Sequence, residues 1–243
     1  MLLLAPSSYV AGVLFLVIMA LLYWGIIRDI SVVATEVLPT TSYFQIFWLP
    51  ALFVVPLLTM RSVAEERRLG TLSTLLTTPT TTLAVVLGKF LAAYVFYCGL
   101  WSLTMLYPFI FSELLPYATF GGLLVDKAPI IGGMTFVCLS GLLFVAVGIF
   151  SSTTTRSQLV AGMQTFTLLF LIIAFANLME MIPVSFEGNP LVGLLEEPLA
   201  YFKAAQHLED FSLGIVDTRP IFYYSSMCAL LLSLAVINVE SRS

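Results

Sequence analysis

One stretch of the chain gathers most of the groups that could do chemistry. Residues 60–79 read MRSVAEERRLGTLSTLLTTP, and their ionisable side chains are Arg61, Glu65, Glu66, Arg67 and Arg68. Residues 63–69 contain no helix breaker, and Gly70 follows them as a residue that can end a helix in the left-handed conformation. A second short helix is expected over residues 72–77, before Pro79. A charged helical hairpin of this kind is a candidate docking surface for a soluble partner.

The rest of the chain is mostly apolar. Of its 243 residues, 60% are hydrophobic and 10% are charged, and the mean hydropathy is +1.03. Soluble domains carry about 25% charged residues, so this composition excludes a soluble fold and predicts an integral membrane protein.

Six apolar runs are long enough to cross a bilayer, which takes about 20 helical residues. We expect spans near 9–27, 43–60, 83–111, 129–150, 158–182 and 220–238. Pro50 and Pro56 predict a kinked second span. The expected fold is therefore an all-α, six-helix membrane domain covering residues 1–243, with the charged hairpin at 61–82 between spans two and three and a long loop at 183–219.

The distribution of Lys and Arg favours a cytoplasmic hairpin. Six such residues fall on the hairpin's side of the membrane: Arg61, Arg67, Arg68, Lys89, Arg156 and Arg242. Four fall on the other side: Arg28, Lys127, Lys203 and Arg219. Cytoplasmic loops carry an excess of basic residues, and an even number of spans places both termini on the same side as the hairpin.

Small residues recur along the fourth span. Gly133 and Ser140 lie seven residues apart, as do Gly141 and Gly148, which gives a face suited to close helix packing. In the loop at 183–219, Phe202, Ala205 and Leu208 share one side of a predicted amphipathic helix that would lie on the outer leaflet or cap the bundle.

No catalytic or metal-binding constellation is recognised. The phosphate-binding pattern GxxxxGK[ST] is absent, so ATP hydrolysis would require a partner. His207 falls in an outer loop without companions that could form a metal site. Cys98, Cys138 and Cys228 lie inside apolar runs, where we expect packing rather than a disulfide or a metal. We expect no cofactor and no nucleic-acid partner.

Several segments resemble one family of transporters. Residues 57–72 (LLTMRSVAEERRLGTL), 75–79 (LLTTP) and 86–90 (VLGKF) closely resemble the ABC-2 family of ABC-transporter permeases, and within it the branch of the gliding-motility and nitrous-oxide-reductase maturation permeases. Residues 207–211 (HLEDF), 214–219 (GIVDTR) and 239–242 (VESR) look like that branch's last outer loop and sixth span.

The resemblance implies a six-helix permease half in the bacterial inner membrane. Two halves, identical or homologous, would pair in the lipid, and each would bind a cytoplasmic ATPase that holds ATP and Mg. The ATPase-coupling residues would be Arg61, Glu65, Glu66, Arg67, Arg68, Gly70, Thr71, Leu75, Leu76 and Pro79. Two features depart from the family: Ser73 stands where Glu is frequent, and almost nothing precedes the first span.

Two functions are consistent with this sequence. The chain could be the permease subunit of an ATP-driven exporter of a lipid-linked, peptidic or hydrophobic substrate. It could instead be a mechanical or assembly subunit that binds the ATPase and passes force to envelope proteins without a substrate path. A membrane enzyme is a third class, but no residue supports it.

Overall fold

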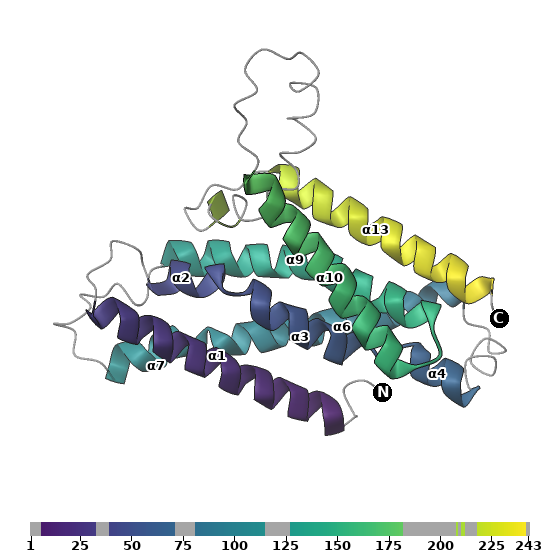
Figure 1. Ribbon diagram of the computed structural model, residues 1–243, viewed down its shortest axis with the longest axis horizontal. Helices are drawn as coiled ribbons and strands as arrows, with labels where there is room; N and C mark the ends of the chain where they lie inside the picture. The colour runs from purple at the N-terminus through teal and green to yellow at the C-terminus, as the bar shows by residue number, and fades with distance from the viewer. Residues whose placement is uncertain are drawn as a thin grey trace, which may run out of the picture.

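The computed structural model describes residues 6–32, 39–70, 81–114, 127–181, 208, 210–211 and 218–241. Over these residues the fold is all-helical, without a strand (Figure 1). Its helices are α1 (Pro6–Val32), α2 (Pro39–Gln45), α3 (Trp48–Thr59), α4 (Ala64–Leu69), α6 (Thr82–Thr104), α7 (Leu106–Leu114), α9 (Lys127–Thr154), α10 (Gln158–Met181) and α13 (Thr218–Glu240).

Among the described residues, six helical segments are long and apolar enough to cross a membrane, which confirms the predicted multi-pass, all-α class. They are Ser8–Asp29, Trp48–Leu69, Thr82–Leu114, Ala128–Thr154, Gln158–Phe175 and Thr218–Glu240. Isolated backbone polar groups are too costly in lipid, and the helices pair these groups within each segment.

Two of the predicted spans are divided, and proline explains both breaks. A proline ring clashes with the carbonyl four residues before it. For Pro50 that carbonyl belongs to Ile46, and the helix is interrupted there, between α2 and α3. The Leu49 amide instead donates to the Ile46 carbonyl at 3.2 Å. For Pro108 it belongs to Thr104, where α6 ends before α7 begins. Pro56 lies inside α3 without breaking it.

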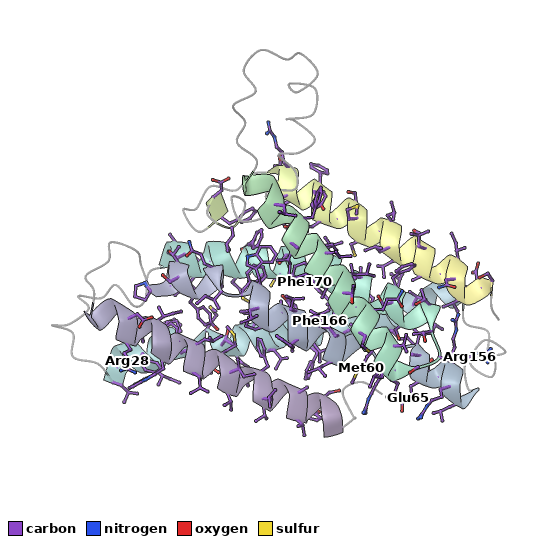
Figure 2. All side chains as sticks on the ribbon, viewed as in Figure 1. Arg28, Met60, Glu65, Arg156, Phe166 and Phe170 are labelled. Carbon is purple, nitrogen blue, oxygen red and sulfur yellow. The ribbon has the colours of Figure 1, made fainter. Side chains whose placement is uncertain are left out.

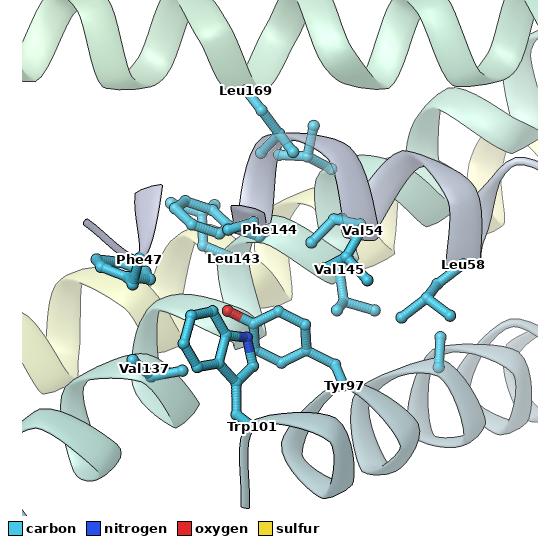
Figure 3. Close-up of a cluster of buried hydrophobic side chains, with 14 of the residues drawn as sticks. Phe47, Val54, Leu58, Tyr97, Trp101, Val137, Leu143, Phe144, Val145 and Leu169 are labelled. Carbon is cyan, nitrogen blue, oxygen red and sulfur yellow. The ribbon is translucent and has the colours of Figure 1, made fainter. Parts of the chain in front are cut away.

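Helix α9 is the centre of the bundle. It packs against α13, α10, α6, α3 and α2. Of its 18 most apolar consecutive residues 67% are buried, compared with 17% for α10. Aromatic and aliphatic side chains pack together around it (Figure 3). The Phe47 ring stacks on Phe144 at 6.4 Å between centroids and meets the Trp101 ring at 6.0 Å.

Helix α4, the end of α9 and the end of α13 lie together at one end of the bundle (Figure 1). The start of α6 follows on the same side, where Thr81 caps the helix by accepting a hydrogen bond from the Ala84 amide at 3.2 Å. Threonine is one of the residues favoured at a helix N-cap.

The loop at 183–219 is described only in part. Leu208 and Phe211 are buried, and the Phe211 ring lies 6.0 Å from Phe136 of α9. Phe202 and Ala205, which belong to the predicted amphipathic helix, lie outside the described residues.

Candidate functional site

The charged helix α4 begins on a group supplied by another span. Its first amides have no partner within the helix, as at every helix start, and the residue before it, Val63, cannot cap with its side chain. The Ser152 hydroxyl of α9 accepts hydrogen bonds from the amides of Val63 and Ala64 at 2.9 and 3.0 Å. A buried serine from α9 therefore fixes where α4 starts.

At its other end α4 stops at Gly70, which has a φ of 71° and a ψ of 7°. This is the left-handed conformation, which costs other residues roughly 1–2 kcal/mol. The Gly70 amide donates to the Arg67 carbonyl at 3.4 Å. The helix is therefore short and bounded at both ends.

Glu66 ties α4 to α6. The Lys89 ammonium lies 2.5 Å from Glu66 Oε1 and 2.5 Å from the Ser62 carbonyl oxygen. The side chains are 18% exposed for Lys89 and 27% for Glu66. Lys89 therefore joins α6 to the charged hairpin.

Arg67 ties α4 to two further spans. One guanidinium nitrogen donates to the Thr153 carbonyl of α9, and the other donates to the Asn238 carbonyl of α13 at 3.1 Å. The Asn238 side-chain amide also donates to the Thr153 hydroxyl at 3.3 Å. The ends of α9 and α13 thus meet at this arginine.

The end of α4 and the glycine after it are open to solvent. Arg68 and Gly70 are exposed, and Leu69 is 62% exposed. Glu65 is half-buried, and Figure 2 shows it pointing away from the bundle at the end that also carries Arg156.

Five predicted coupling residues lie outside α4 and Gly70: Arg61, Thr71, Leu75, Leu76 and Pro79. Arg61 is half-buried in the turn before α4. Thr71, Leu75, Leu76 and Pro79 lie outside the described residues.

The small residues of α9 face three different helices. A Cβ at Gly133 would overlap the Phe44 ring of α2, one at Gly141 would overlap the Tyr97 ring of α6, and one at Gly148 would overlap the Thr59 side chain of α3. Ser140 is buried and donates to the Phe136 carbonyl at 2.9 Å. These residues belong to the packing of the bundle, away from α4, except that Gly148 lies one turn before Ser152.

An apolar groove of about 570 Å³ lies between α10 and α13 with α9 at its floor. Phe144, Ile172 and Met227 are among its lining residues, and the Tyr223 and Tyr224 rings lie at the part of α13 farthest from α4. A smaller apolar pocket of about 130 Å³ lies between α1 and α3.

Within the described ranges, no group of three or more His, Cys, Asp or Glu side chains is placed to hold a metal ion. His207 lies outside those ranges.

The chain matches no protein-family model and no curated protein.

Four residues at the site were not singled out for it from the sequence: Ser152, Thr153, Asn238 and Lys89. The run SSTTT at 151–155 could have indicated Ser152 and Thr153, because hydroxyl side chains at the end of an apolar span are suited to bonding backbone groups. Asn238 offers only a lone amide near the end of the last span.

Proposed function

We propose that the chain is the membrane-spanning permease subunit of an ATP-binding-cassette exporter, coupled through residues 61–82 to a separate ATPase subunit. In this proposal the hairpin and both termini lie in the cytoplasm of a bacterial cell, and a second permease half completes the transporter. ATP and Mg are bound by the ATPase.

The observation that carries the proposal is the division of charge on α4. Glu66 and Arg67 bond to α6, α9 and α13, whereas Arg68 and Leu69 are exposed and Glu65 points away from the bundle. A helix that is hydrogen-bonded to three spans and presents charged side chains on its exposed side can bind a soluble protein. Movement of that protein would then displace the spans of the membrane domain. The resemblance of residues 57–72 to ABC-2 permeases supports an ATPase as that protein.

The apolar groove between α10 and α13 and the smaller pocket between α1 and α3 indicate which kind of substrate an exporter of this kind would carry. Both are lined by apolar side chains, which suits a hydrophobic or lipid-linked cargo better than an ion or a sugar. The same lining is equally compatible with the second candidate function, a mechanical subunit without a substrate path, because such a subunit needs no polar passage. Substrate-stimulated ATP hydrolysis in liposomes is expected of an exporter and not of a mechanical subunit.

The test is purification of the chain with its partner. We expect a nucleotide-hydrolysing subunit to copurify, and we expect reversal of the exposed charges by Glu65→Lys with Arg68→Glu to release it. Arg28→Glu, at the opposite end of the bundle (Figure 2), is the matched control and should leave the complex intact. Retention of the ATPase by the doubly reversed variant would show that α4 is not its docking surface.

A further inference from the structure

Arg67 contacts the ends of two membrane-spanning helices that are far apart in the chain. Its two acceptors, the carbonyls of Thr153 and Asn238, lie within the last four residues of α9 and α13. Carbonyls in that last turn have no partner inside their own helix. A single side chain therefore donates to both helix ends, and at Asn238 the Ser241 hydroxyl donates to the same carbonyl at 3.3 Å.

The chemistry of this position suits arginine. The end of each helix carries a partial negative charge of about half an elementary charge, and a guanidinium carries its donors in a fixed planar fork that reaches two acceptors at once. A lysine would keep the positive charge but would present it as a point, with no fixed fork. The adjacent Arg68 has the same charge and is exposed.

The link to α13 distinguishes Arg67 from the other ties of α4. Ser152 joins α4 to α9, and Lys89 joins it to α6. Arg67 adds α13, and the Asn238 amide joins α13 to α9 at the same point. A movement of α4 must therefore either carry the ends of α9 and α13 with it or break the Arg67 hydrogen bonds.

We propose that Arg67 is the positioning residue that transmits displacement of α4 to the ends of α9 and α13. The source of that displacement, a partner ATPase, rests on the proposed function. The mechanical link itself belongs to this chain alone and can be measured without any partner.

The experiment is a distance measurement by double electron–electron resonance in lipid nanodiscs. Spin labels are placed at Leu69→Cys on α4 and Ile237→Cys on α13, whose native side chains are 62% and 59% exposed, in a background with Cys98, Cys138 and Cys228 replaced by alanine. The variants are Arg67→Gln and Arg67→Lys, with Arg68→Gln and Arg68→Lys as matched controls.

The wild type and both Arg68 variants should give one narrow distance distribution. Arg67→Gln should broaden it and add longer distances, and Arg67→Lys should give an intermediate width because charge remains without the fork. If Arg67→Gln fails to fold, the comparison of Arg67→Lys with Arg68→Lys decides the question. Equal distributions for the Arg67 and Arg68 variants would overturn the proposal.

The partner ATPase is then added to separate the two proposals. ATP-dependent change in the distance in the wild type, lost in Arg67→Gln while the ATPase remains bound, is expected if both hold. If Arg67→Gln broadens the distribution but no ATPase binds, the link stands and the proposed function is wrong.

Discussion

Around α4 the helices are joined by polar groups, whereas in the middle of the bundle α9 meets its neighbours through glycines and aromatic rings. The hydrogen bonds at Glu66 and Arg67 lie at half-buried positions, where water can replace a broken partner at modest cost. At Gly141 the neighbouring Tyr97 ring is fully buried and no solvent can fill a gap. The α4 end can therefore rearrange while the middle of the bundle stays fixed.

The largest loss of stability is expected when a tightly packed glycine of α9 is replaced by alanine. Gly141→Ala should destabilise the protein by about 1–3 kcal/mol, because the new Cβ overlaps the buried Tyr97 ring and overpacking forces side chains out of their preferred positions. Gly148→Ala should act similarly against Thr59. Unfolding followed by circular dichroism in detergent measures this.

Gly99→Ala in α6 is the matched control. No atom lies within 4 Å of its Cβ position, and alanine is preferred over glycine inside a helix by up to about 1 kcal/mol. It should therefore be neutral or slightly stabilising. Equal loss of stability at Gly99 and Gly141 would contradict the role assigned to the middle of the bundle.

The next effect concerns Glu66 and Glu65, which are adjacent and of the same type. Glu66→Ala removes the partner of Lys89 and should cost about 1.5 kcal/mol, the lower end of the range for a hydrogen bond to a charged group, because both side chains are partly exposed. It should also abolish coupling in the complex with the ATPase while the protein remains in the membrane. Glu65→Ala should leave stability unchanged within about 0.5 kcal/mol. Thermal unfolding and ATPase assays on both variants test this, and the idea fails if the two behave alike.

A smaller effect is expected at the two ends of α4. Ser152→Ala removes the cap on the Val63 and Ala64 amides and should cost about 1 kcal/mol. Gly70→Pro forces φ to about −65° where the structure has 71°, so it should disrupt coupling without removing the protein from the membrane. Hydrogen exchange of the 61–70 backbone should rise in both variants, and unchanged exchange would contradict this description of α4.

The smallest effect on stability should come from the exposed charge. Arg68→Gln should alter the free energy of unfolding by less than about 0.5 kcal/mol, yet it should weaken ATPase binding in a salt-dependent way, since exposed charge pairs are screened by salt. Binding assays at two ionic strengths measure this. Binding that is independent of both the substitution and salt would move the docking surface away from α4.

The class of fold follows from the sequence because lipid requires long apolar helices, and the six runs correspond to the six span-length segments. The helix over residues 64–69 and its end at Gly70 follow from the absence of breakers and from the glycine. The break at Met105 could also have been predicted, since Pro108 obstructs the Thr104 carbonyl by the same rule as Pro50 obstructs that of Ile46.

The site is less predictable. The sequence shows a pair of acids followed by a pair of arginines, but it does not show which member of each pair faces the bundle. That register depends on Lys89, Ser152 and Asn238, and Asn238 lies 171 residues from Arg67. Likewise, the spacing of Gly141 and Gly148 indicates a packing face on α9 but does not identify Tyr97 and Thr59 as the side chains that fill it.

The most direct measurement is cross-linking from the exposed tip of α4. With Leu69→Cys in a background free of other cysteines, a thiol-reactive photo-cross-linker in membrane vesicles should join the chain to a nucleotide-hydrolysing subunit, and a membrane-impermeant maleimide should label the residue only from the cytoplasmic side. Labelling from the opposite side, or cross-links that never include such a subunit, would contradict the account.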